Sequence, residues 1–360
     1  MTRVGTRFAV AAALGLSALR AAAADSAVVL IYHHVDDDTP AATSVRPAEF
    51  AAQLEFIEEG GYRVLPLFEL IEALSGGEPV PENSVAITFD DAYVSVLTEA
   101  MPLLSERGWP FTVFVGTEAV DAGYRNYLNW EQLRTLGAAG ATIGNHSVSH
   151  AHLVRRDAGE TEAAWVRRVA AEIETARERL AAEVGDYLIP VFAWPYGEYM
   201  VELKPLLAEL GYFGLGQQSG AMGRDSDFAA LPRYPVATGM NLDDEFALRL
   251  RSLPLPVSLT RTEAHVVMPD DPRPALEFAV ADSGDIRLAE LACYAPAQGR
   301  MPLELIDADR RVYRARPVEP LGVGRSKYNC TAPSRMRTGA YYWYSYLWMR
   351  RHDDGRWYEE

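Results

Sequence analysis

The sequence predicts an α/β protein, a distorted parallel β/α barrel followed by a small antiparallel β domain. Short apolar runs alternate with amphipathic helical stretches from residue 25 to residue 250, and this alternation is typical of a mainly parallel sheet. After the Leu-Pro-Leu-Pro stretch at 253–256, which we interpret as a linker, short apolar runs are separated by Pro, Gly and Asp. That change favours antiparallel strands. We therefore expect domains at 25–252 and 257–360, with an open doubly wound sheet as the alternative to the barrel.

The elements follow from the spacing of apolar residues. Strands are expected where short apolar runs meet turn or acidic residues, at 27–32, 85–89, 110–116, 141–145, 187–194 and 212–216. Helices are expected where apolar residues recur every three or four positions, at 47–60, 94–107, 130–138, 161–183 and 199–210. Later strands are expected at 263–268, 286–293 and 340–349. The last run is rich in aromatic residues, which suits a sandwich core or a sugar-stacking surface.

The amino-terminal segment predicts export. Arg3 and Arg7 precede an apolar run at 8–19, and alanines at 22–24 form a small-residue cleavage site, as in a secretory signal peptide at 1–24. The run is shorter than the roughly 20 residues that span a bilayer. We therefore expect a periplasmic or secreted protein with no membrane span after cleavage.

The net charge and the cysteines indicate which partners and which compartment suit the protein. The net charge of the chain is −16, and cleavage would remove three arginines and no acid to leave −19. A nucleic-acid or anionic-lipid partner selects for a basic face, so both are excluded. Cys293 and Cys330 are the two cysteines. In an oxidising compartment we expect them to form a disulfide, with two unpaired buried thiols as the alternative.

Two adjacent acids come directly after an apolar strand. Asp90 and Asp91 follow the run SVAITF, at the strand end where β/α folds bind ligands. Burying such charges costs several kcal/mol unless they are paired or bound to metal. The alternative interpretation is a helix-capping acid beside a solvated neighbour.

A histidine pair follows another strand. His146 and His150 come after the strand expected at 141–145, and a helical turn there would place both on one face. Two His and one Asp suit a divalent ion with open positions for water and substrate. The second carboxylate would then be free to act as a general base. His152 is expected to face outward.

Two further segments end strands. Trp194-Pro195-Tyr196-Gly197 forms a turn that can aim a backbone N–H at an oxyanion, although it also reads as an ordinary strand-end turn. His33 and His34 end the first strand and should point to opposite faces. One of them could protonate a leaving amine, and the alternative is a hydrogen-bonded structural histidine.

These motifs together resemble the polysaccharide deacetylase family, also called NodB-homology domains, over roughly residues 27–250. The resemblance implies Asp90 as general base, Asp91, His146 and His150 as metal ligands, and the Tyr196 amide as oxyanion donor. It implies a divalent metal, with zinc expected and nickel or cobalt as alternatives. The implied partner is a polysaccharide substrate, with an N-acetylglucosamine polymer expected.

Two departures from the family pattern refine the expectation. Ala193 stands where the family has an arginine that orients the base, and no downstream Leu-x-His motif supplies an acid. Both features are similar to the permuted poly-β-1,6-N-acetylglucosamine deacetylases, whose acid histidine comes from the amino-terminal strand. This implies His33 as the acid, with His34 as second choice, and Arg233 as a replacement for the missing arginine. Trp194 and Pro195 are weaker candidates for a substrate-contacting or orienting role.

The expected function is metal-dependent removal of N-acetyl groups from an extracellular or cell-envelope polysaccharide. Two alternatives remain at this point. One is a carbohydrate-binding protein without turnover, which the complete set of Asp90, Asp91, His146 and His150 disfavours. The other is a metal-dependent esterase or amidase acting on a small molecule.

Overall fold

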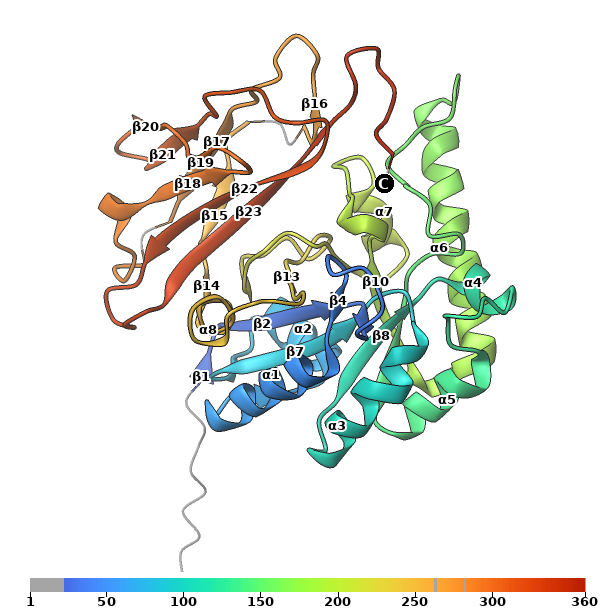
Figure 1. The fold of residues 1–360 in the computed structure, drawn as a ribbon. Coiled ribbons are helices and arrows are strands. Elements are labelled where there is room, and N and C mark those ends of the chain that lie inside the picture. Colours follow the sequence, from blue (N-terminus) through green and yellow to red (C-terminus); the bar gives the residue numbers. More distant parts are fainter. Residues whose placement is uncertain (1–22, 262–263, 282, 360) are drawn as a thin grey trace, which may run out of the picture.

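The computed structural model describes residues 23–261, 264–281 and 283–359. Figure 1 shows an α/β body, coloured blue to yellow, with the orange and red carboxy-terminal strands above it. The predicted signal peptide lies outside the described residues except for Ala23 and Ala24, which form β1 (Ala23–Ala24) and pair with β6 (Val80–Pro81). Within the described ranges, no helix has both the length and the apolar character needed to cross a bilayer.

A nine-stranded, mainly parallel sheet forms the α/β body, and only β12 joins it in the antiparallel sense. The six strands expected from the sequence are confirmed within one or two residues. They are β2 (Ser26–Tyr32), β7 (Ser84–Phe89), β8 (Phe111–Val115), β9 (Ala141–Asn145), β10 (Leu188–Ala193) and β11 (Phe213–Leu215). Three short strands complete it, β5 (Arg63–Val64), β12 (Met222–Gly223) and β13 (Tyr234–Pro235).

The two ends of this sheet approach each other through one segment. Leu231 forms a bridge with Leu215 of β11 at one end of the sheet. Strand β13 follows shortly after Leu231 and pairs with β2 near the other end. The sheet is therefore curled, in keeping with a β/α barrel rather than the open doubly wound alternative.

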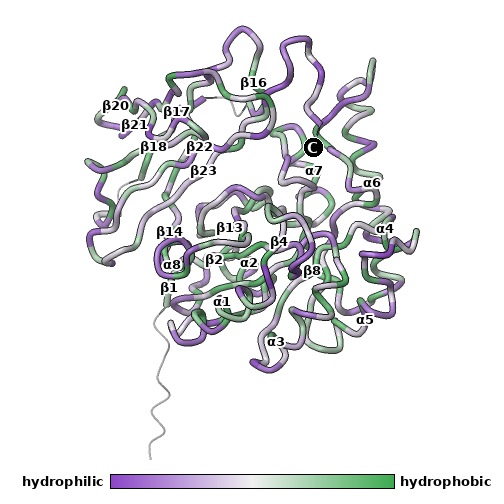
Figure 2. The backbone as a smooth tube through the Cα atoms, in the orientation of Figure 1, coloured by the Kyte–Doolittle hydropathy of each residue, from purple (hydrophilic) through white to green (hydrophobic). Residues whose placement is uncertain are grey.

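Helices cover the curled sheet, so its strands are buried on both faces. They are α1 (Pro47–Glu59), α2 (Leu67–Ser75), α3 (Met101–Glu106), α4 (Thr117–Asp121), α5 (Trp130–Ala138), α6 (Glu162–Val184), α7 (Lys204–Glu209) and α8 (Ala247–Leu250). Val29, Leu30 and Ile31 have no exposed surface, which is why β2 is a continuous apolar run. Figure 2 shows this hydrophobic stretch along β2.

Two predicted helices differ from expectation, and proline explains both. The helix expected at 94–107 begins as a π turn at Val96–Ala100, in which the Met101 N–H bonds to the Val96 carbonyl, before α3. Pro102 has no N–H for the Thr98 carbonyl, so an unbroken α-helix cannot form there. The helix expected at 199–210 is present only as α7, where Pro205 occupies the first turn. Helices α2, α4 and α8 were not predicted.

The carboxy-terminal region forms two packed sheets. One is antiparallel and contains β15 (Val257–Leu259), β17 (Leu276–Val280), β20 (Leu303–Asp307) and β21 (Val312–Ala315). The other contains β14 (Leu253–Pro254), β16 (Val266–Val267), β18 (Ala292–Ala295), β19 (Gly299–Arg300), β22 (Gly324–Pro333) and β23 (Tyr341–Arg350). Their shared core includes Phe278 and Tyr328, as expected for sheet-on-sheet packing.

Three details of this region differ from the sequence prediction. The first two residues of the expected linker form β14, which pairs in parallel with β23, as β16 also does. Of the strand expected at 263–268, only Val266–Val267 is a strand, and residue 263 lies outside the described residues. The strand expected at 286–293 is a 3₁₀ turn at Leu288–Glu290 followed by β18. The structure joins Cys293 of β18 to Cys330 of β22 by a disulfide.

Candidate active site

The carboxyl ends of neighbouring parallel strands bring the motif residues together. Asp90 and Asp91 follow β7, His146 follows β9, and Tyr196 lies in the turn after β10. The Asp90 N–H donates to the Tyr32 carbonyl at the end of β2, at 2.9 Å. Four motifs that are far apart in sequence therefore meet at one edge of the sheet, where β/α folds place their chemistry.

Asp91, His146 and His150 form a compact group of ligand atoms. Asp91 Oδ1 lies 3.4 Å from His146 Nε2 and 3.2 Å from His150 Nε2, and one ligand atom from each residue lies within 4.8 Å of the others. His146 Nδ1 is 2.7 Å from the Ala193 carbonyl, to which it donates. Its Nε2 is then a lone-pair donor, buried and without a hydrogen-bond partner. These residues fit a divalent metal ion.

The segment between the two histidines is a strained loop, so the expected helical turn is wrong. Ser147 and His150 have φ of 68° and 52°, values that a helix excludes. Asn145 Oδ1 accepts from the Ser147 N–H at 2.9 Å, and Ser147 Oγ accepts from the His150 N–H at 3.1 Å. The polar side chains of the motif thus stabilise the bend that turns both imidazoles toward Asp91.

Left-handed backbone conformations gather around this group. Eight non-glycine residues in the described ranges have positive φ, and five of them belong to the strand-end motifs. Those five are Asp91, Ala92, Ser147, His150 and Tyr196. Such conformations cost on the order of 1–3 kcal/mol each and are retained mainly at functional sites.

Asp90 is paired with Arg233. Both residues are fully buried, and the guanidinium donates from Nη1 to Asp90 Oδ1 at 2.7 Å and from Nη2 to Oδ2 at 2.8 Å. Burial alone would raise the pKa of Asp90, but the charge and the hydrogen bonds of the Arg233 guanidinium outweigh it and hold that pKa below its usual value. Arg233, directly before β13, therefore holds the carboxylate of Asp90 in one orientation.

His33 and His34 have different surroundings. His33 lines the same cavity as Asp91 and His150. The His34 ring instead stacks on Tyr93 with centroids 3.6 Å apart. Burial lowers the pKa of His34, although the charge of Asp91 acts in the opposite direction. Of the two, His33 is the one that lines this cavity.

His152 does not face outward as expected. Its Nδ1 lies 2.8 Å from Glu198 Oε2, and its ring stacks on Tyr196 with centroids 3.9 Å apart. Glu198 is buried and also accepts from the Tyr358 hydroxyl. His152 is thus a packing partner of the Tyr196 turn. No sequence pattern marks Glu198 as its partner.

Buried residues hold the turn after β10 in place. Trp194 is fully buried, and its indole N–H donates to the Ala229 carbonyl at 2.8 Å. Pro195 is buried and precedes Tyr196, whose φ is 59°. Trp194 and Pro195 therefore fix the backbone of Tyr196 from inside the fold and do not line the cavity themselves.

A cavity of about 670 Å³ opens beside the ligand group, within the usual range for ligand sites. Among the lining residues that the sequence did not predict are Tyr93, Gln217, Arg325 and Lys327. Gln217 Nε2 lies 3.5 Å from Asp90 Oδ2. These residues have no motif of their own, and Arg325 and Lys327 come from β22, so only the three-dimensional fold reveals them.

Part of the chain matches a known protein family. The family model described as polysaccharide deacetylase matches residues 77–214. An Escherichia coli K12 poly-β-1,6-N-acetyl-D-glucosamine N-deacetylase is 29% identical over 241 residues, covering 58% of this chain and 35% of that protein. The chain thus contains a polysaccharide deacetylase domain with homology to the poly-β-1,6-N-acetylglucosamine deacetylases, and it spans about a third of the length of the curated E. coli relatives it matches.

Solved structures share the fold. IcaB from Ammonifex degensii has a TM-score of 0.53 and 25% identity, covering 59% of this chain and 93% of that one. The Streptococcus pyogenes deacetylase PplD, solved in complex with acetate, has a TM-score of 0.55 and 23% identity, covering 61% and 95%.

Proposed function

We propose that this protein is an exported, metal-dependent N-deacetylase acting on a polysaccharide, with an N-acetylglucosamine polymer as substrate. The observation that carries the proposal is the Asp91, His146 and His150 group beside the buried Asp90–Arg233 pair, at the strand ends and open to one cavity. We also propose that the chain divides into units at 25–252 and 257–360.

Asp91, His146 and His150 would hold the metal, with zinc expected and nickel or cobalt as alternatives. A bound divalent ion would lower the pKa of a water molecule and polarise the acetyl carbonyl. The Ala193 carbonyl fixes the tautomer of His146 through Nδ1, as outer hydrogen bonds do for metal-bound histidines.

Asp90 would accept the proton of the attacking water. The Arg233 guanidinium keeps its carboxylate ionised and in one orientation. Arg233 is therefore a positioning residue, which acts through Asp90 rather than on the substrate. The fixed geometry helps because a general base must lie within hydrogen-bond reach of the proton it takes.

Two groups would act on the acetamido group while its C–N bond is cleaved. Its nitrogen needs a proton, and His33 in the cavity is the candidate donor, with His34 held against Tyr93 as second choice. The backbone amide of Tyr196 would donate to the carbonyl oxygen as negative charge develops there. The turn around Tyr196 is held by Trp194 and by His152.

One assay separates this function from its competitors. The purified protein is incubated with a panel of acetylated glycans and small acetyl esters and amides, and acetate release is measured with and without chelator. We expect chelator-sensitive release from N-acetylglucosamine polymers. Binding without acetate release would mean a carbohydrate-binding protein, and release only from small acetyl compounds would mean a small-molecule esterase or amidase.

A further inference from the structure

The carboxy-terminal sheet supplies part of the catalytic cavity. Lys327 of β22 donates from Nζ to the Gln217 carbonyl at 2.5 Å. Arg325 donates to the Tyr196 carbonyl at 3.1 Å and lies 5.3 Å from the centre of the Tyr196 ring. Strand β22 therefore touches both loops that flank Asp90 and the ligand group, and it forms one wall of the cavity.

The alternation of side chains along β22 shows which other residues lie on the same face as Arg325 and Lys327. Along β22 the even-numbered residues from Ser326 to Ala332 are buried, and the odd-numbered ones are only partly buried or exposed, so the odd positions share one face. Pairing places Thr331 opposite Trp343, and Asn329 opposite both Ser345 and Tyr294. The face that begins with Arg325 and Lys327 thus continues to Asn329 and Thr331 and to their partners on β18 and β23.

A second cavity, of about 380 Å³, lies on this continuation. It is lined by Tyr294, Asn329, Thr331, Tyr341 and Trp343 of the sheet and by Leu248 of α8. Tyr294 is 40% exposed. Three aromatic side chains thus stand beside an amide and a hydroxyl on one surface.

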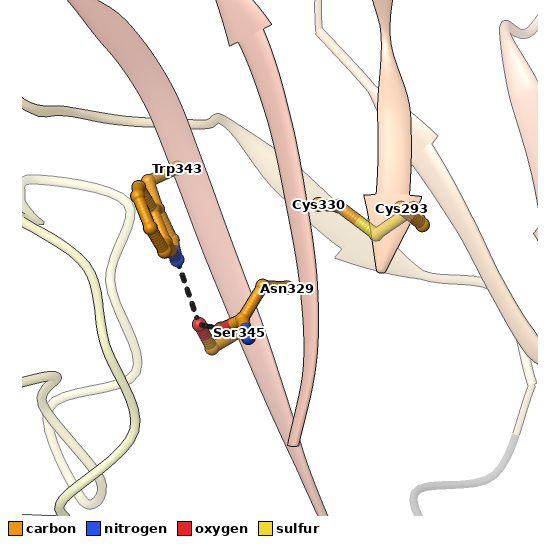
Figure 3. Close-up of a disulfide and its surroundings, with 5 residues drawn as sticks. All are labelled: Cys293, Asn329, Cys330, Trp343 and Ser345. Carbon is orange, nitrogen blue, oxygen red and sulfur yellow. Dashed lines mark hydrogen bonds between the residues drawn. A yellow bond between two sulfur atoms is a disulfide. The ribbon is translucent and has the colours of Figure 1, made fainter. Parts of the chain in front are cut away.

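Hydrogen bonds fix the polar part of this surface. The Trp343 indole N–H donates to Ser345 Oγ at 2.9 Å, and Ser345 Oγ donates to Asn329 Oδ1 at 2.6 Å. Figure 3 shows this chain of hydrogen bonds and the nearby Cys293–Cys330 disulfide. Because its oxygen accepts this bond, the amide nitrogen of Asn329 is the donor end of that side chain. The Trp343 ring packs perpendicular to the Tyr234 ring of the α/β body, with centroids 5.6 Å apart.

This combination matches the chemistry of a pyranose chain. The C–H faces of sugar rings pack on aromatic faces, while their hydroxyl and acetamido groups need hydrogen-bond partners, and sites of this kind mix aromatic walls with a few placed polar groups. The lining residues Tyr294, Tyr341, Asn329 and Thr331 carry no charge, so the surface suits a neutral glycan rather than an anion.

We propose that this face of β22 and β23 is a glycan-binding strip for sugar units remote from the one being deacetylated. The inference rests on the proposed function and adds the requirement for an extended chain. Lys327 in the catalytic cavity and Thr331 in the second cavity are separated by roughly 14 Å along the strand. A polymer with one acetamido group at the ligand group reaches the strip, and a disaccharide does not. Binding energy from remote units then contributes to turnover.

Substrate length tests the strip. Acetate release is measured for wild type, Tyr341→Ala and Tyr294→Ala on a disaccharide and a hexasaccharide of β-1,6-linked N-acetylglucosamine. We expect wild type to favour the hexasaccharide, and each variant to lose about tenfold in kcat/KM on it, as for a central aromatic contact, with a much smaller loss on the disaccharide. Tyr341→Phe keeps the ring and should keep most of the preference. Leu305→Ala, 51% exposed on β20 of the other sheet, is the matched control.

Direct binding separates the strip from the chemistry. In an Asp90→Asn background, calorimetry measures the affinity for the hexasaccharide with and without Tyr341→Ala, after circular dichroism has verified the fold. About tenfold weaker binding supports the strip even if wild type releases no acetate, an outcome that would count against the proposed function alone. Unchanged affinity together with an unchanged length preference in both alanine variants overturns the inference.

Discussion

At the scale of single residues, the site depends on side-chain contacts that cannot be predicted from the spacing of residues in the sequence. The sequence identified Asp90, Asp91, His146 and His150 because each follows an apolar strand. The bidentate contact between Arg233 and Asp90 was suggested only through the family resemblance, and the structure shows it at 2.7 and 2.8 Å. Gln217 and Lys327 were missed, because their positions depend on loops and on a strand more than a hundred residues away.

His33→Ala is expected to separate proton donation from metal binding. The variant should keep its metal and lose most of its turnover on amides, by roughly 10²–10⁴-fold, because an amide anion leaves poorly without a proton. An activated acetyl ester, whose leaving group needs no proton, should lose much less. Steady-state rates on both substrates, with metal content by mass spectrometry, check this. Equal losses on amide and ester would assign His33 a positioning or structural role.

Lys327 is expected to make the free energy of unfolding depend on pH. Burial and then the nearby charges of Arg325 and Arg233 lower its pKa from 10.5 to about 8. Between these values the unfolded chain holds a proton that the folded protein has lost, so the contribution of Lys327 to the free energy of unfolding rises with pH. Below pH 8 the buried charge opposes folding.

The check compares wild type with Lys327→Met by denaturant unfolding at several pH values. Relative to the variant, wild type should gain stability from about pH 8 to about pH 10.5. A difference between the two proteins that stays constant over this range would show that the ammonium is solvated in the folded state.

At the scale of elements, helix α6 holds the loop that carries both histidines. Glu172 accepts from the Val148 N–H at 3.1 Å, the Ser149 N–H at 3.0 Å and the Ser149 hydroxyl at 3.0 Å. The sequence predicted α6 from its apolar stripe, because packing sets the periodicity of that face. It gave no role to Glu172, since an acid on the polar face of a helix has no distinguishing pattern.

Glu172→Ala should therefore weaken metal binding without removing a ligand. Loss of these hydrogen bonds frees the loop that aims His146 and His150, and such supporting contacts are typically worth 10–100-fold in metal affinity. Competition with a chromophoric chelator measures the change. Glu174→Ala, an exposed acid two residues along the same helix that pairs with Arg177, is the control. The same affinity in both variants would rule out a supporting role for Glu172.

At the scale of the whole molecule, the alternation of strands and helices predicted the parallel α/β body, and the change after residue 253 predicted the carboxy-terminal sheets. The contact between the two could not be predicted. It includes the odd-numbered face of β22, which the sequence shows only as alternating residues. It also includes Leu347 and Met349 of β23, which share a buried cluster with Trp194 of the α/β body. The disulfide between Cys293 and Cys330 connects neighbouring strands of this sheet.

Removing the disulfide should destabilise these sheets. The cysteines are 37 residues apart, and closing a loop of that size contributes about 4 kcal/mol through the unfolded chain. The double variant Cys293→Ser/Cys330→Ser should lose stability of this order in denaturant unfolding. Its rate of acetate release should also fall more on long oligomers than on a disaccharide, because β22 carries the proposed strip. Unchanged stability would show that the bridge is dispensable.

The central claim is that one divalent ion, held by Asp91, His146 and His150, supports deacetylation with Asp90 as base. The most direct test follows acetate release from N-acetylglucosamine oligomers while metal is removed with chelator and returned as zinc, nickel or cobalt. Bound metal is counted in wild type, Asp90→Asn and His146→Ala/His150→Ala. We expect activity to follow metal content in wild type, Asp90→Asn to keep metal but lose roughly 10²–10⁴-fold in turnover, and the double histidine variant to lose both. Stoichiometric metal in the double histidine variant, or undiminished acetate release from metal-free wild type, would contradict the account.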